Sequence, residues 1–100
     1  MTHVIVWEFR VREGFERAFE EAYGPRGGWA ALFARSPQCL GTALLKDESS
    51  PGRYLTLDRW TTAEAFAEFK ATHGAAYDDL DAHCAAWTDT EVRIGAWKEL

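Results

Sequence analysis

The sequence predicts one α+β domain of ferredoxin-like topology, with elements in the order strand, helix, strand, strand, helix, strand. Two observations predict it. Apolar residues alternate along four segments, as in half-buried antiparallel strands, and recur every three or four residues in the segments between, as in helices. The chain of 100 residues has the size of one domain, so residues 1–100 are expected to form a single unit.

The first strand and the helix after it are defined by the spacing of their apolar residues. Ile5 and Trp7 share one face of a strand expected over residues 2–11. A helix is expected over residues 15–23, where an apolar stripe runs opposite charged side chains. Residues 24–28, Gly-Pro-Arg-Gly-Gly, end this helix. A simple helix break is the interpretation we favour for them, and a hinged lid is the alternative.

The remaining elements follow from turn and capping signals. A short helical segment is expected over residues 29–34, and a hairpin over residues 39–46 and 53–60, joined by a Ser-Ser-Pro-Gly turn. Thr61 has the spacing of a capping box that begins the second long helix. Alternation resumes in a last strand over residues 90–97. The predicted fold is therefore a four-stranded antiparallel sheet with helices on one face.

Such a sheet leaves its second face uncovered. Apolar groups point to both faces, because Val4 and Val6 lie opposite Ile5 and Trp7. A large exposed apolar face requires a partner, and a second copy related by two-fold symmetry is the simplest one. We therefore expect a homodimer in which two sheets pack face to face.

Charge and cysteine content exclude several classes of protein. The formal net charge is −5 and the basic residues are scattered, which disfavours nucleic acid and anionic membranes as partners. No segment has the roughly 20 apolar residues that span a bilayer, and no signal peptide is visible. Cys39 and Cys84 stand far apart and match no metal-binding spacing. Two reduced thiols in a cytoplasmic protein are expected.

Motifs along the chain resemble one known family. Residues 54–60, Tyr-Leu-Thr-Leu-Asp-Arg-Trp, precede Ala-Glu-Ala-Phe at residues 63–66 and then His73, and residues 7–14 read Trp-Glu-Phe-Arg-Val-Arg-Glu-Gly. This pattern resembles the antibiotic biosynthesis monooxygenase (ABM) domain family over nearly the whole chain. The resemblance implies a dimeric α+β barrel with a pocket between the helices and the sheet. The resemblance alone does not identify the reaction, because the family includes cofactor-free oxygenases of aromatic polyketides, quinol oxygenases, haem-degrading enzymes and proteins of no known activity.

The haem-degrading branch is the one that individual residues argue against. The resemblance implies, for that branch, a triad of an Asn on the first strand, a Trp on the second helix and a His a few turns later. Here Trp7 stands where the Asn would be, Phe69 where the Trp would be, and Asp79 where the His would be. Haem degradation is therefore not expected.

His73 and Asp58 are the candidate catalytic residues. His73 is on the apolar stripe of the second long helix, where it can accept a proton from a phenol or quinol near neutral pH. The alternative is a structural His bonded to a backbone carbonyl. Asp58 lies near the end of its strand and can orient His73 or act as the base itself. A salt bridge is the simpler interpretation of Asp58 beside Arg59.

Aromatic side chains provide the candidate substrate-binding wall. The set comprises Trp7, Trp29, Trp60, Phe69 and Tyr77. These rings can stack on a flat ligand, and each can equally belong to the core. A cavity of roughly 300 Å³ or more beside His73 would favour a ligand, whereas a filled interior would favour a dimer without one.

Two functional hypotheses remain open. The first is a cofactor-independent monooxygenase of a small phenol-like or quinol-like aromatic compound, with no cofactor or metal. The second is a non-catalytic homodimer that binds a small apolar ligand or has a structural role. The resemblance favours the first hypothesis, and the lack of a strong catalytic motif favours the second.

Overall fold

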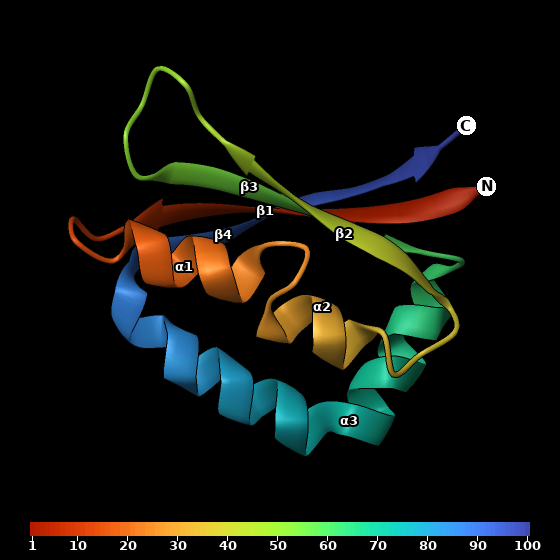
Figure 1. Cartoon of the computed structure of the whole chain (residues 1–100). Coiled ribbons are helices and arrows are strands. Elements are labelled where there is room, and N and C mark those ends of the chain that lie inside the picture. The colour runs from red at the N-terminus through yellow and green to blue at the C-terminus, as the bar shows by residue number, and fades with distance from the viewer.

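One layer of the molecule is a four-stranded antiparallel sheet, and all the helices lie against one face of it (Figure 1). The computed structural model describes residues 1–100. In chain order the elements are β1 (Thr2–Val11), α1 (Glu16–Tyr23), α2 (Gly28–Phe33), β2 (Cys39–Lys46), β3 (Arg53–Trp60), α3 (Ala63–Cys84), a 3-10 turn (Ala85–Trp87) and β4 (Thr88–Glu99). None of the helices combines the length and apolar character needed to cross a bilayer.

The sheet has the strand order β2-β3-β1-β4. This is the order of a ferredoxin-like fold, so the predicted fold class is confirmed. β1 and β3 occupy the centre and supply much of the core, including Ile5, Phe9, Tyr54 and Trp60. The period-two alternation of both strands places these side chains on the face that the helices cover.

The start of α3 differs from the sequence prediction. The N-cap is Thr62 rather than Thr61, because the Thr62 hydroxyl accepts a hydrogen bond from the Ala65 amide at 3.0 Å. The Thr61 hydroxyl donates instead to the side chain of Gln38, which ties the helix start to the loop before β2. The helix also kinks at His73, whose backbone is non-helical with φ −114° and ψ 23°.

The break between α1 and α2 requires glycine for packing. A Cβ atom at Gly27 would lie 2.1 Å from the carbonyl oxygen of Ala22, closer than any real contact. The Gly27 amide also donates to the Gly24 carbonyl at 3.0 Å. These contacts fix the chain where it changes direction and support the interpretation as a helix break.

No helix covers the second face of the sheet (Figure 1). Strand pairing places Val6, Leu57 and Ala43 side by side on it, and Val4 opposite Trp97. Trp97 is 53% exposed. We call this the open face.

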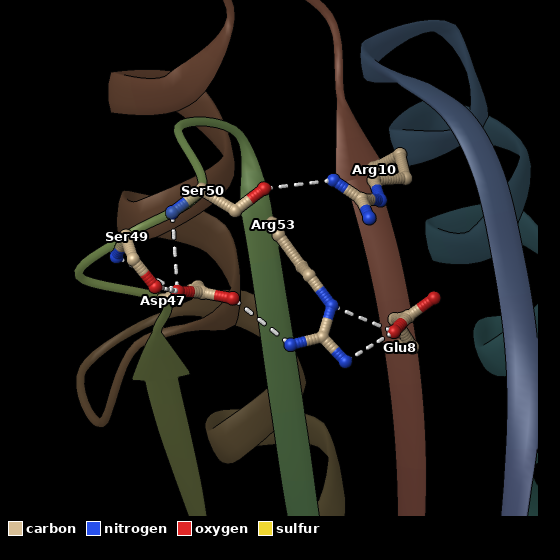
Figure 2. Close-up of polar contacts among 6 residues, drawn as sticks. All are labelled: Glu8, Arg10, Asp47, Ser49, Ser50 and Arg53. Atoms are coloured by element: carbon tan, nitrogen blue, oxygen red, sulfur yellow. Dashed lines mark hydrogen bonds and ion pairs between the residues drawn. The ribbon is translucent and has the colours of Figure 1, made fainter.

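One charged cluster interrupts the open face near the β2–β3 turn (Figure 2). The Arg53 guanidinium donates to Glu8 on β1 and to Asp47 at the end of β2, with an Nη1–Oδ2 distance of 2.9 Å to Asp47. Arg10 donates to the Ser50 hydroxyl at 3.0 Å. The hairpin is thereby held against the central strand.

Candidate functional site

A small cavity lies between the helices and the covered face of the sheet. Its volume is about 30 Å³, and every strand and helix contributes to its wall. Its lining residues are Trp7, Phe9, Tyr23, Trp29, Phe33, Thr42, Thr56, Asp58, Tyr77 and Glu91. The cavity therefore combines an aromatic wall, which includes two tyrosines, with two carboxylates and two threonine hydroxyl groups.

The alternation of β3 directs Asp58 toward this cavity. Tyr54, Thr56, Asp58 and Trp60 fall on the covered face, since they are two residues apart. Antiparallel pairing sets Asp58 opposite the buried Ile5 of β1 on one side and opposite Thr42 of β2 on the other. Asp58 thus has an apolar neighbour and a hydroxyl neighbour on the same face.

Burial raises the pKa of Asp58 from 3.8 to about 7. Desolvation of the charged form is the one cause, and no neighbouring cation offsets it. The salt bridge expected with Arg59 does not form, because Arg59 points away and binds Glu99 at 3.1 Å. A carboxylate with this pKa changes protonation near neutral pH, as a general base must.

Trp7, Trp29 and Tyr77 are the predicted wall residues that line the cavity. The rings of Trp29 and Tyr77 meet edge to face, with centroids 5.0 Å apart. The buried Trp29 indole N–H lies beside the side chains of Tyr23 and Cys84 but makes no close hydrogen bond to either, which is costly unless a better acceptor reaches it. Burial also raises the pKa of Tyr77 to about 12, so its phenol stays protonated as a donor at neutral pH.

The other three predicted site residues lie outside the cavity wall. Trp60 is 0% exposed and Phe69 is 3% exposed, and both belong to the aromatic core around Phe33. His73 is half-buried at the kink of α3, where its ring centroid lies 5.0 Å from that of Phe69. The cavity wall thus includes Asp58 but not His73.

Glu91 is a cavity residue that the sequence did not single out. It pairs with Phe9 across β1 and β4, and burial followed by the charge of Asp81 raises its pKa. The last strand carries a register shift between its pairings with Val6 and Trp7, so simple alternation does not predict its inward residues. Phe9 and Phe33, which also line the cavity, were indistinguishable from core in the sequence.

The cavity volume bears on what can enter. A cavity of about 30 Å³ has room for a water molecule. It lies well below the roughly 300 Å³ of small ligand sites. A hydroxyl group fits beside Asp58 in this structure, but an aromatic ring requires further space.

A family model described as antibiotic biosynthesis monooxygenase matches residues 2–92 of the chain. The chain belongs to this ABM family. Among curated proteins, none matches it significantly. The family match accords with the resemblance found in the strand and helix motifs around Asp58 and Trp60.

Solved structures of ABM proteins share the fold. SnoaB, a cofactor-independent oxygenase from Streptomyces nogalater, is 24% identical with a TM-score of 0.73, and the match covers 99% of this chain and 93% of SnoaB. A proposed ABM protein from Bordetella bronchiseptica is 19% identical with a TM-score of 0.77, covering 99% and 97%. One from Nitrosomonas europaea is 19% identical with a TM-score of 0.76, covering 99% and 90%. At these identities the likeness shows the fold.

Proposed function

We propose that this ABM-family protein is a cofactor-independent monooxygenase of a small phenol-like or quinol-like aromatic compound. One observation carries the proposal: Asp58 faces an aromatic cavity without a counter-charge, and burial raises its pKa to about 7. The likeness to SnoaB, itself a cofactor-independent oxygenase, supports the same reaction class.

The proposed reaction starts with proton transfer from the substrate hydroxyl to the Asp58 carboxylate. The resulting phenolate is electron-rich and reduces molecular oxygen, forming a new carbon–oxygen bond to a peroxide. The ring C–H proton then moves to the peroxide, the O–O bond breaks to release hydroxide, and Asp58 returns its proton to this hydroxide to give water. The sum is phenol plus O₂ giving quinone plus water, with four electrons passed from the ring to oxygen.

Donors around the cavity would stabilise the phenolate. The Tyr77 phenol remains protonated at neutral pH, and the buried Trp29 indole N–H lies beside Tyr23 and Cys84 without a close hydrogen bond to either. Hydrogen bonds to an anion in a desolvated site are stronger than those between neutral groups. In this proposal Trp7 and Trp29 form part of the wall of the cavity that receives the substrate hydroxyl group.

His73 is the second candidate for the catalytic base. It lies outside the cavity wall, so it would reach a substrate only if the kinked part of α3 moved. We therefore assign the base to Asp58 and leave His73 as the competing assignment.

The homodimer belongs to the same proposal. The open face carries partly exposed apolar residues, including Leu45, Val92 and Trp97, which a second sheet would cover. Cys39 and Cys84 are both free thiols, which suits the reducing cytoplasm.

A non-catalytic dimer is the second candidate function. The cavity volume of about 30 Å³ favours it, because a space of that size holds no aromatic ring without rearrangement. A protein of this kind would bind a small apolar compound or none.

Oxygen uptake distinguishes these candidates. Purified, chelator-treated protein is mixed with a panel of phenols, quinols and naphthols, and Asp58→Asn and His73→Ala are measured beside the parent. The proposal predicts uptake that survives chelation and falls by about 10²-fold or more in Asp58→Asn. Loss in His73→Ala with full activity in Asp58→Asn would move the base to His73. No uptake across the panel would favour the non-catalytic candidate.

A further inference from the structure

A groove on the outer side of the cavity is larger than the cavity itself. It lies between α2 and the edge strand β2, which run side by side (Figure 1), and its volume is about 230 Å³. Its lining residues are Pro25, Ala30, Ala34, Cys39, Gly41 and Thr42. None of them is charged, and most are small.

The groove is hollow because the edge strand is irregular there. The pairing of β2 with β3 shifts register between Cys39 and Gly41, which is a β-bulge. Gly41 has φ +121°, a backbone conformation that side chains rarely adopt, and a Cβ atom there would meet nothing within 4 Å. Bulges at sheet edges commonly occur beside functional sites.

Thr42 connects this groove to the Asp58 cavity. It lines both spaces, and it pairs directly with Asp58 across β2 and β3. Directly opposed residues on one face of an antiparallel pair have Cβ atoms about 5 Å apart. A group that enters the groove as far as Thr42 is therefore close to the Asp58 carboxylate.

The sizes of the cavity and the groove suit different parts of a substrate. The cavity accommodates one hydroxyl group, whereas the groove approaches the size of small ligand sites. The uncharged lining of the groove favours a neutral ring. The carboxylates of Asp58 and Glu91 in the adjoining cavity disfavour an anionic one.

We propose that the groove between α2 and β2 is the subsite for the ring system of the substrate, a flat uncharged aromatic compound that directs a hydroxyl group past Thr42 to Asp58. This inference rests on the proposed oxygenase function for its chemistry, but the subsite is tested by binding alone. 2-Naphthol is a suitable probe, because it has two fused neutral rings and one hydroxyl group.

Binding is measured by NMR titration of the ¹⁵N-labelled protein with 2-naphthol. The subsite predicts amide shifts centred on Ala30, Ala34 and Thr42. Ala30→Phe fills the groove and should weaken binding at least about tenfold, a change of about 1.4 kcal/mol. Ala31→Phe is the matched control, because Ala31 is exposed on the same helix and does not line the groove, and it should bind as the parent does. If Ala30→Phe loses the dispersed spectrum of a folded protein, Ala34→Leu replaces it.

Alkylation gives a second readout. Cys39 lines the groove and is half-buried, whereas Cys84 is buried elsewhere. Bound 2-naphthol should slow the reaction of Cys39 with iodoacetamide. Peptide mass mapping measures the extent of this reaction at each cysteine. Unchanged Cys39 reactivity at saturating 2-naphthol would overturn the subsite. Three other outcomes would also overturn the subsite: no binding of 2-naphthol, amide shifts centred on the open face, or an affinity of Ala30→Phe equal to that of the parent.

The subsite and the oxygenase function fail in different ways. Binding of 2-naphthol in the groove without oxygen uptake would overturn the reaction and leave the subsite standing. Oxygen uptake that is unaffected by Ala30→Phe would overturn the subsite and leave the reaction standing. Asp58→Asn keeps a side-chain oxygen that can accept from the hydroxyl group but cannot act as a base, so retained binding of 2-naphthol in the groove together with loss of uptake would support both.

Discussion

Thr42 and Asp58 lie directly opposite each other on the neighbouring antiparallel strands β2 and β3. Their pairing places a hydroxyl group from the sheet edge beside a carboxylate from the sheet interior. Thr42 also lines the groove beside α2, whereas Asp58 lines the small aromatic cavity. This pair of residues therefore connects the surface groove to the carboxyl group of Asp58, whose pKa burial raises to about 7.

The buried charge of Asp58 should make the fold less stable as pH rises. Its folded pKa of about 7 exceeds its ordinary value of 3.8, so the folded state binds more protons between these values. The free energy of unfolding should consequently fall as pH rises from about 4 to 7. Asp58→Asn should remove this slope and stabilise the protein by roughly 1–3 kcal/mol at pH 8. Urea unfolding across this pH range measures both effects.

The control for this substitution is Asp78→Asn, which removes one carboxylate from an exposed position of α3. It should leave the stability at pH 8 nearly unchanged. Equal pH slopes in the parent and in Asp58→Asn would show that Asp58 titrates as an ordinary carboxylate.

The open face should hold two copies together. Leu57 lies at its centre, paired with Val6 and Ala43, and a lysine there would place an unpaired charge within an apolar interface. Sedimentation velocity should find a dimer for the parent and a monomer for Leu57→Lys. Ala31→Lys, which adds the same charge on the exposed side of α2, should remain dimeric. A parent protein that sediments as a monomer at high concentration would contradict the proposed dimer.

Arg53 should stabilise the hairpin in a way that acid removes. Hydrogen bonds from the Ser49 amide and from Arg53 hold the pKa of Asp47 at about 2. A lowered carboxyl pKa contributes stability above the unfolded value of 3.8, and this contribution is lost as pH falls toward 2. Arg53→Met should therefore lower the urea midpoint clearly at pH 7 and less at pH 2.5.

Arg17→Met provides a comparison for Arg53, because Arg17 makes a surface ion pair with Glu21 on α1 and its side chain is 93% exposed. Exposed pairs of this kind contribute little. Similar losses in both variants at pH 7 would mean that the Arg53 cluster is an ordinary surface pair.

Tyr54 should fasten α1 to the sheet. Its buried ring lies under the helix, and its hydroxyl donates to the Glu20 carboxylate, which also binds Lys46 at 3.0 Å. The bond from Tyr54 is the main cause that lowers the pKa of Glu20. Tyr54→Phe should cost about 1 kcal/mol of unfolding free energy, since Glu20 is partly exposed and water replaces the donor. An unchanged thermal midpoint would show that the bond contributes nothing net.

The fold was predictable because its strands and helices have regular spacing. The predicted ranges of the four strands and of the first two helices agree with the structure within two residues at each end. The last strand is longer than predicted, from Thr88 to Glu99, because polar residues continue the pairing with β1 beyond the apolar alternation.

The site was predictable only in part. Asp58, Trp7, Trp29 and Tyr77 line the cavity, as their faces and family motif suggested. Helical spacing placed His73 on the same stripe as Tyr77, but the kink at His73 breaks that stripe, and a kink changes which side each half of a helix presents.

Strand and helix patterns could not separate cavity residues from core residues. Trp60 and Phe69 are as aromatic as Trp29, yet the packing of Phe33 against both places them in the core. Glu91 faces inward because of the bulge in β4, for which the one sequence signal is Gly95 within the strand. Three-dimensional packing, not residue type, decides such positions.

The protonation of Asp58 is the most direct test of the central claim. Carboxyl ¹³C NMR follows the titration of each Asp, and the resonance that is missing in Asp58→Asn identifies this one. A midpoint near 7 is predicted, because burial raises the pKa of Asp58 to about 7. A midpoint near the ordinary value of 3.8 would contradict the claim, since Asp58 would then be a solvated carboxylate and too weak a base for the proposed reaction.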